Sequence, residues 1–488
     1  MLRPWNLTME IDRSSTKAIY LQLADSIAAD IQSGRLAPGT ALPSSRALAT
    51  QLKLNRNTVV EAIQQLLSEG WVLSQERRGI FVAEQLPPLL SKAEGSTRSK
   101  SLSTLQTPLR IIFDDGNPDS KIVPIDQLGR AYRQIFKRSA RWKMMGYADP
   151  KGHIDFRQAI VDMLNQERNM NITPANLCIS RGSQMAMYLV AQCLLKKDDY
   201  IFVESPGYHS AWKIFEHTGA TLIQVPVDEH GIIVDDMIPH LKECKNIKAV
   251  YLTPHRQYPT TATLSQARRS ELIQLSNQYG FTVIEDDYDY EFHFEDTPCY
   301  PLASTGELQH SIYIGTLSKV VAPALRIGYL VSKDEQLLHA IAQLRYMIDI
   351  QGDNIMEQAV LELIQDGTLR RHIRKATNYY RGKRDFMIKQ LDLHLSEHVD
   401  YHCPQGGLAV WLACKHQVDW TLLFNKLKEK SIHIPHPDNY HKDDSYGGLR
   451  LGYGALSEEQ IEEGIRILAD LLQQARTGPK GVSAQQNS

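Results

Sequence analysis

One lysine and one arginine interrupt an apolar stretch, GTLSKVVAPALRIGYL, at residues 315–330. Burying the ammonium of Lys319 is costly unless it is paired or enters a covalent bond, such as a Schiff base with an aldehyde. The guanidinium of Arg326 suits a phosphate, because its planar fork matches two oxygens. The stretch therefore predicts a site for an anionic aldehyde. A purely structural lysine is the alternative.

Acidic and phenolic side chains directly follow another apolar strand. VIEDDYDY places Asp286 and Asp287 at the end of this strand. A buried carboxylate there requires a cation, such as a pyridinium nitrogen. Tyr288 can donate to a phenolate oxygen. A divalent-metal pair and a solvated strand end are the alternatives.

A second candidate for phosphate binding is the start of a helix in ISRGSQMAMYLVAQCLL. Gly182, Ser183 and Gln184 open this helix, and its first N–H groups are free to bind an anion. Thr316 and Ser318 add hydroxyls beside Lys319. In open α/β sheets, ligands lie outside the carboxyl ends of the strands. These segments are therefore expected to share one site.

The elements that position these residues form a large α/β body. From about Arg110 the chain alternates apolar strands with helical patterns, which predicts a mainly parallel sheet. We assign the body, with a smaller C-terminal α+β part, to residues 111–474. Residues 475–488 are expected to be a disordered tail. Residues 84–110, rich in Ser, Pro and Lys, predict a flexible linker.

A small head occupies residues 10–83. Its pattern is helix, helix, tight turn, helix and hairpin, which is the order of a winged helix-turn-helix. Ser44 is the expected cap of the second helix. A protein-docking module is the alternative, because the head carries little net charge. The expected DNA contacts are Ser45, Arg46, Asn55, Arg56, Thr58, Arg77 and Arg78, the last two at the hairpin tip.

The bulk composition is ordinary: 42% hydrophobic, 23% charged, net charge −2 over 488 residues. Two or three domains are expected at this length. No stretch reaches the roughly 18 apolar residues of a membrane span. The six cysteines are scattered without a C-x-x-C pair. We therefore predict a cytoplasmic protein with reduced thiols, no structural metal and no membrane segment.

Two resemblances unite these features. The segment from LAPGTALPSSRALATQL to RRGIFV resembles the DNA-binding domain of the GntR superfamily. The ordered motifs Gly-Ser-Gln, Pro-Gly-Tyr, Asp-Asp-Tyr, Thr-x-Ser-Lys and Arg, within about residues 112–472, resemble the fold-type I, aspartate-aminotransferase-like enzymes that use pyridoxal 5′-phosphate (PLP). A GntR-type head on such a body is the arrangement of the MocR/GabR subfamily of bacterial transcription regulators.

The resemblance implies a role for each motif residue. Lys319 would form the internal aldimine, Asp286 would hold the pyridine nitrogen, and Tyr288 would contact the ring oxygen. Tyr208 of ESPGYHS would stack on the ring. Residues around the phosphate would be Gly182, Ser183, Gln184, Thr316, Ser318 and Arg326. Tyr147 of GYADPKG would reach a phosphate in a neighbouring subunit, which implies a homodimer. Arg450 would grip the α-carboxylate of an amino compound.

Two departures from the resemblance bear on function. Tyr258 stands where aminotransferases carry an asparagine beside the ring oxygen, which weakens the case for efficient transamination. Ser210 stands where GABA-responsive members carry an arginine, so a GABA-like ω-carboxylate is not expected.

We therefore predict a PLP-dependent regulator that binds a double-stranded operator with two half-sites and senses an amino compound or PLP itself. The sequence leaves open whether it is an enzyme, and weak or partial transaminase activity is compatible with this prediction. A working aminotransferase with an appended head is the main alternative. A DNA-binding protein with an empty body is the third reading, and the presence of Lys319, Asp286 and Arg326 argues against it.

Overall fold

The chain divides into two compact units, Met1–Leu105 and Gln106–Ser488. The hairpin tip with Arg77 and Arg78, and nearly all of the predicted linker, lie outside the residues that the structure describes. The computed structural model describes residues 17–75, 79–84, 86, 109–137, 145–295, 299–440 and 447–479.

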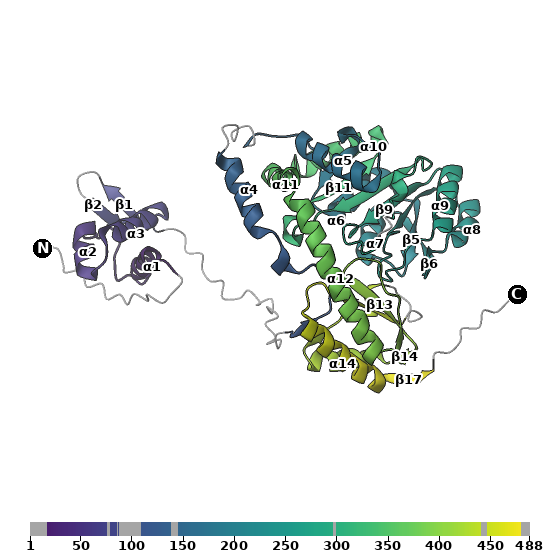
Figure 1. Cartoon of the computed structure of the whole chain (residues 1–488). Coiled ribbons are helices and arrows are strands. Elements are labelled where there is room, and N and C mark those ends of the chain that lie inside the picture. Colours follow the sequence, from purple (N-terminus) through teal and green to yellow (C-terminus); the bar gives the residue numbers. More distant parts are fainter. Residues whose placement is uncertain are drawn as a thin grey trace. The chain divides into compact units, whose positions relative to one another are not determined.

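The first unit has the element order predicted for a winged helix-turn-helix (Figure 1). Its helices and strands are α1 (Ile19–Gln32), α2 (Ser45–Leu52), α3 (Arg56–Ser68), β1 (Val72–Gln75) and β2 (Gly79–Val82).

Two side-chain caps fix the starts of the second and third helices of this unit. Ser44 Oγ accepts from the Ala47 N–H (3.2 Å). Asn55 Oδ1 accepts from the Asn57 N–H (2.9 Å). The buried faces of α1, α2 and α3 then meet β1 and β2 in a single small core. The cap that was predicted at Ser44 is confirmed.

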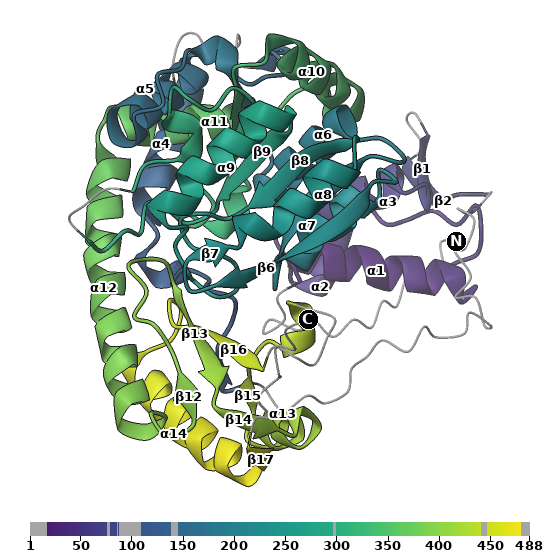
Figure 2. The ribbon, with the colours of Figure 1, turned by 90° about the vertical axis from the view of Figure 1, so that its right-hand side faces the viewer.

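The second unit contains an eight-stranded sheet (Figure 2). In spatial order its strands are β4 (Leu177–Ser180), β11 (Gly328–Ser332), β10 (Ser311–Thr316), β9 (Thr282–Asp287), β8 (Ile247–Leu252), β5 (Tyr200–Ser205), β6 (Thr221–Asp228) and β7 (Gly231–Ile232). The five strands from β10 to β6 are parallel. The predicted mainly parallel sheet is therefore confirmed, with β11 and β7 as antiparallel exceptions.

Helices cover both faces of this sheet, because alternate strand residues are apolar on each side. Ile201 and Ile284 face the helices α6 (Ser183–Leu194), α7 (His209–Glu216) and α10 (Glu335–Asp349). Phe202 and Val283 lie on the opposite face of the sheet, where they share a core with α8 (Ile238–Glu243) and α9 (Gln266–Tyr279). The remaining covering helices are α4 (Ile125–Lys137), α5 (Ile154–Arg168) and α11 (Asn354–Gln365).

A smaller α+β part follows the long helix α12 (Thr368–His394). Its three-stranded sheet has the order β12 (Val399–Asp400), β13 (Ala409–Cys414) and β16 (Gly448–Gly452). Two strand pairs add β15 (Ile432–His433) with β3 (Ile111–Ile112), and β14 (His416–Val418) with β17 (Arg476–Pro479). The helices α13 (Trp420–Glu429) and α14 (Glu458–Gln474) pack against this part.

The strand β17 contradicts part of the predicted disordered tail. Residues 475–488 were predicted to be disordered, yet Arg476–Pro479 pairs antiparallel with β14. The segment RTGP has no apolar alternation, so its pairing rests on backbone groups that a hydrophobic pattern does not reveal. Residues 480–488 lie outside the described part of the chain.

Candidate functional site

A cavity of about 450 Å³ lies at the carboxyl ends of the parallel strands. Residues from six separate segments meet there because β8, β9 and β10 end side by side. Its lining is Asp115, Asn117, Ser183, Gln184, Tyr208, Tyr251, Thr253, Tyr258, Asp286, Tyr288, Thr316, Ser318, Lys319, Pro323 and Arg326. Most of the predicted cofactor residues are thus brought together.

Lys319 follows β10 and points its ammonium at an aromatic face. Its Nζ lies 4.6 Å from the centroid of the Tyr288 ring. Burial lowers the pKa of Lys319, and the charge of Arg450 acts in the same direction, against the raising influence of Asp289. A lowered pKa increases the fraction of neutral amine, which is the nucleophilic form. The lysine is therefore suited to covalent chemistry with a carbonyl.

Asp286 presents a buried carboxylate that is only half satisfied. The residue is 4% exposed, and its Oδ2 accepts from the Tyr251 hydroxyl (2.8 Å). Its Oδ1 has no hydrogen-bond partner among the described residues. Burial raises the pKa of this carboxyl to about 7. An orphaned acidic oxygen at this depth fits a cationic ring nitrogen, which would supply both a donor and a positive charge.

The start of α6 and one arginine form a cradle for an anion. Gly182 caps the helix at φ +82°, and a Cβ there would lie 2.8 Å from Arg326 Nη2. The guanidinium therefore packs directly against the glycine, while Ser183 and Gln184 supply the first N–H groups of α6. A helix N-terminus beside an arginine suits a phosphate. The residues present thus fit the PLP phosphate as well as its ring.

Three tyrosines besides Tyr251 line the cavity. Gln184 Nε2 donates to the Tyr208 hydroxyl (2.9 Å), and Tyr208 meets Tyr258 edge-on with centroids 5.1 Å apart. The Tyr288 hydroxyl donates to the Arg256 carbonyl (2.9 Å). The rings predicted at 208, 258 and 288 therefore line one site.

Three predicted residues, Gly182, Arg450 and Tyr147, are not part of the cavity lining. Arg450 is 1% exposed, and its Nη1 donates to the Pro259 carbonyl (2.7 Å) while its guanidinium stacks on Tyr258 at 4.9 Å. It is therefore held behind Tyr258. Tyr147 is 86% exposed and is not part of this lining.

Five lining residues were missed in the sequence analysis: Asp115, Asn117, Tyr251, Thr253 and Pro323. Tyr251 and Thr253 sit at the end of β8, and Thr253 Oγ1 donates to Glu204 (2.8 Å). A tyrosine at the end of an apolar strand was the available signal. Asp115 and Asn117 come from the segment after β3.

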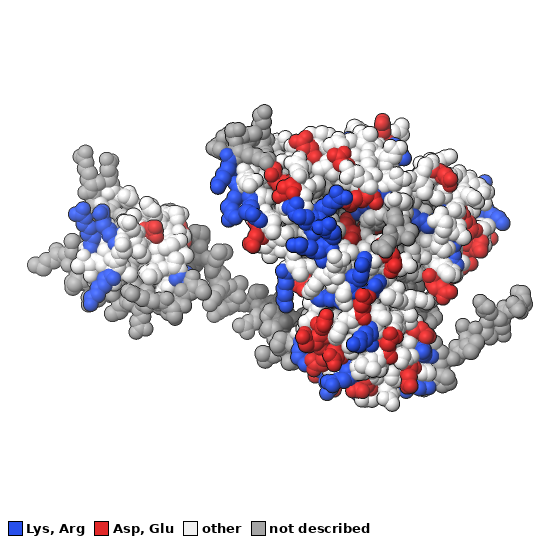
Figure 3. Space-filling model, in the orientation of Figure 1, with Lys and Arg blue, Asp and Glu red and all other residues white. Residues whose placement is uncertain are grey.

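The head places several predicted DNA contacts on its surface. Arg46, Asn55 and Arg56 are exposed, whereas Ser45 and Thr58 are half-buried. Basic side chains of the described head residues are visible in Figure 3. The first-turn position of Arg56 in α3 suits contact with a groove or backbone.

The body therefore has the sheet, lysine, acid and anion cradle of a fold-type I PLP protein. Residues 111–468 match the family described as aminotransferase class I and II, so the chain belongs to this family, whose cofactor is PLP. Residues 19–82 match the bacterial regulatory proteins of the gntR family. The predicted combination of head and body is confirmed.

Full-length relatives share both parts. A Bacillus subtilis protein described as the uncharacterized HTH-type transcriptional regulator YdfD is 26% identical over 93% of this chain and 96% of its own length. The probable rhizopine catabolism regulatory protein MocR of Rhizobium meliloti is 25% identical, over 94% of each chain. Among solved structures, an archaeal alanine:glyoxylate aminotransferase is similar with a TM-score of 0.70 and 26% identity, covering 75% of this chain and 91% of that one.

Proposed function

We propose that this protein is a PLP-dependent transcription regulator whose body senses an amino compound, or PLP itself, and alters how the head binds DNA. The observation that carries the proposal is the pairing of a gntR-type head with a body that keeps Lys319, the half-satisfied Asp286 and the anion cradle. Relatives with both parts are named as regulators. Such a role places the protein in the cytoplasm.

In this proposal the residues of the cavity hold and orient the cofactor. When bound, PLP supplies an aldehyde carbon and an electron-withdrawing ring. Lys319 would hold it covalently, and the lowered pKa of this lysine suits its amine to release and take back a proton at Nζ. Asp286 would stabilise the protonated ring nitrogen, while Arg326 and the start of α6 would hold the phosphate. Tyr208 and Tyr288 would contact the ring.

The position of Arg450 favours sensing over efficient turnover. Its guanidinium already donates to a backbone carbonyl and stacks on Tyr258. A ligand carboxylate would have to displace these contacts before Arg450 could grip it. Such a rearrangement suits a switch between two arrangements better than rapid catalysis. We infer that amine binding moves Tyr258.

A homodimer is the proposed assembly. Exposed apolar side chains gather on two neighbouring segments, which the Ala148 N–H joins by donating to Gln351. We name them the apolar patch: Met145, Tyr147, Ile154, Tyr346, Met347 and Ile348, each between 44% and 86% exposed. A second copy covering this patch would bring its Tyr147 towards the partner's cofactor. Two heads per dimer require two half-sites in the operator.

The assignment of Lys319 is tested by replacing it. In Lys319→Ala the visible absorption band of bound PLP should disappear, and borohydride should fix no cofactor to the chain. Lys333→Ala, an exposed lysine outside the cavity, is the matched control. A borohydride-stable adduct in Lys319→Ala would show that another residue holds PLP.

The regulatory role needs a DNA-binding assay on four samples: apo protein, holo protein, holo protein with amine, and Lys319→Ala. Affinity or footprint should differ among them, because the ligands must distinguish two arrangements. Equal DNA binding by all four samples would favour the alternative, a working aminotransferase with an appended head.

The DNA surface itself is tested with Arg56→Ala. If this residue reads a base, its loss should cost about 1–3 kcal/mol of binding free energy. Wild-type binding and footprint in this variant would remove Arg56 from the interface.

A further inference from the structure

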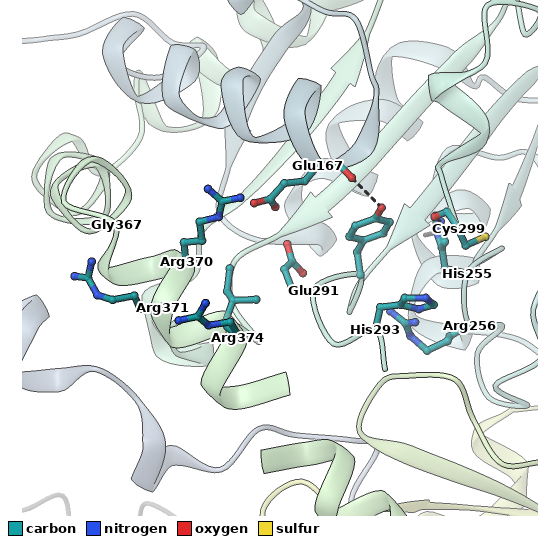
Figure 4. Close-up of a pocket in the computed structure, with 12 residues that line it drawn as sticks. Glu167, His255, Arg256, Glu291, His293, Cys299, Gly367, Arg370, Arg371 and Arg374 are labelled. Carbon is teal, nitrogen blue, oxygen red and sulfur yellow. Dashed lines mark hydrogen bonds between the residues drawn. The ribbon is translucent and has the colours of Figure 1, made fainter. Parts of the chain in front are cut away.

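The body contains a second and larger cavity, of about 720 Å³ (Figure 4). It is bounded by the start of α12, the end of α5 and the segment after β9. Figure 4 shows Arg370, Arg371 and Arg374 on one side, with His255 and Cys299 on the other. Among the described residues, the two cavities share no lining residue. The proposed function gives this cavity no role.

The charge inside this cavity is unbalanced. Arg370 and Arg374 have no hydrogen bond or ion pair with any described residue, and both are exposed. Among the described residues, Arg371 donates only to the Asp366 carbonyl and the Thr368 hydroxyl, which do not neutralise it. Figure 3 shows basic side chains gathered on this face of the body.

The acids of the cavity offset little of this charge. Glu291 is ion-paired with the buried Arg168, which already neutralises the charge of this carboxylate. Glu167, at the rim, is the remaining acid of the described lining. On the opposite wall, Arg256 pairs with Asp289 (2.6 Å). The arginines of α12 therefore leave a net positive site.

The position of these arginines near the start of α12 adds to the uncompensated positive charge. Cations near a helix N-terminus oppose the helix dipole, and the first turn of α12 carries no acidic residue. The 27-residue helix nonetheless begins Thr-Leu-Arg-Arg-His-Ile-Arg-Lys. A bound anion would relieve both the arginine charges and the dipole. Residues that break a local preference in this way are expected at functional sites.

We propose that this cavity is a second anion site, which binds the phosphate of a small phosphate ester through Arg370 and Arg374 at the start of α12. Its volume is in the range of small-molecule sites. The arginines line a hollow that also holds Tyr290 and His293, which favours a compact ligand over the backbone of a duplex. Arginine forks match phosphate oxygens better than isolated ammonium groups do.

The walls of this cavity touch the cofactor site. His255 Nδ1 lies 3.2 Å from Asp287, the neighbour of Asp286. The Arg256 carbonyl accepts from the Tyr288 hydroxyl, whose ring lines the cofactor cavity. A ligand that shifts either residue therefore acts on the groups that hold the PLP ring. We expect phosphate binding here to change the visible absorption of bound PLP.

The test uses the full-length holo protein without DNA, so that PLP occupies its own phosphate cradle. Inorganic phosphate and glycerol 3-phosphate are titrated at constant ionic strength, and binding is measured by calorimetry and ³¹P line broadening. The wild type should bind both probes saturably. Arg370→Gln with Arg374→Gln should weaken binding by about tenfold or more, since two charge-assisted contacts are lost. Lys375→Gln, an exposed neighbour outside the cavity, is the matched control and should bind like the wild type.

Three results would contradict the proposal. Equal phosphate binding by wild type and double variant would exclude these arginines. An equal loss in Lys375→Gln would indicate unspecific attraction to a basic surface. Unchanged phosphate binding, with weaker DNA binding and a smaller salt dependence in the double variant, would assign the arginines to DNA. A fourth result, phosphate binding with an unchanged PLP band, would refute the link to the cofactor site.

Discussion

Asp286 illustrates how a functional residue can oppose stability. Its carboxyl is 4% exposed and keeps one oxygen without a partner among the described residues. Burial raises its pKa to about 7, from about 4 in an unfolded chain. As pH rises from about 4 to 7, the unfolded state therefore loses its proton first. This carboxyl destabilises the apo protein increasingly over that window, and fully above it.

The replacement Asp286→Asn should therefore have opposite effects on apo and holo protein. At pH 8 the apo variant should melt at a higher temperature than apo wild type, by the equivalent of a few kcal/mol at most. Near pH 4 the difference should vanish. PLP should bind more weakly, because the ring nitrogen loses its counter-charge. Calorimetric melting and PLP titration at both pH values measure this.

Asp236→Asn is a suitable control, since that acid lies in a surface turn and is exposed. A lower melting temperature of apo Asp286→Asn at pH 8 would show that the charged carboxylate is satisfied by contacts beyond those described.

The thiol of Cys299 gives a second prediction at this scale. Burial would raise its pKa, but the neighbouring His255 imidazolium and Arg269, whose Nη1 lies 3.8 Å from Sγ, outweigh burial and lower it. Burial raises the pKa of Cys193 and of Cys403. Limiting iodoacetamide at pH 7.5 should therefore alkylate Cys299 before these two, since the thiolate is the nucleophile.

Peptide mass spectrometry measures this order, and His255→Gln should reduce the preference for Cys299. Faster labelling of Cys403 would show that exposure outweighs the charge of the thiol.

Sequence motifs located most of the site at the residue scale, but they did not fix side-chain orientation. Lys319, Asp286 and Arg326 meet in one cavity, as their motifs predicted. Tyr251 was missed because it belongs to an apolar strand, although its hydroxyl donates to Asp286 in the site. The place of Arg450 behind Tyr258 depends on long-range packing of β16 against the loop after β8, which spacing does not encode.

Elements with local signals were predicted well, and elements formed by distant backbone pairing were not. The capping residues Ser44 and Asn55 mark where α2 and α3 begin. The antiparallel direction of β11 and the strand β17 depend on partners far along the chain. Turn and cap chemistry is read within a few residues, whereas strand direction is decided by the whole sheet.

The cap of α2 permits a prediction at the scale of the element. Ser44→Ala removes the acceptor for the Ala47 N–H and should lower head stability by about 1 kcal/mol. Ser44→Asp should restore it, because aspartate also caps and suits the helix dipole. Hydrogen exchange of the buried amides Leu48 and Ala49 in the full chain reports this. Unchanged exchange in Ser44→Ala would mean that tertiary packing alone holds α2.

At the scale of the whole molecule, PLP binding and DNA binding are both expected to depend on a second copy of the chain. Tyr147, which is 86% exposed, has no place in the cavity of its own chain. Exposed apolar side chains on neighbouring segments favour an interaction site where they form a shared surface. In the proposed homodimer, the apolar patch would join the two copies, and a partner's tyrosine would complete the cradle.

The replacement Met347→Asp should separate these copies, because it buries a carboxylate at the proposed interface, where Met347 is 75% exposed in the single chain. Sedimentation should show a monomer at micromolar concentration, and PLP should dissociate faster. Affinity for an operator with two half-sites should fall by about a hundredfold or more, since each head then binds alone. Binding to a single half-site should stay unchanged.

Leu393→Asp, at an exposed position on α12 away from the patch, is the matched control. A dimeric Met347→Asp with wild-type DNA affinity would place the dimer interface elsewhere, whereas a monomer that still binds both half-sites tightly would show that the heads do not depend on the body for their pairing.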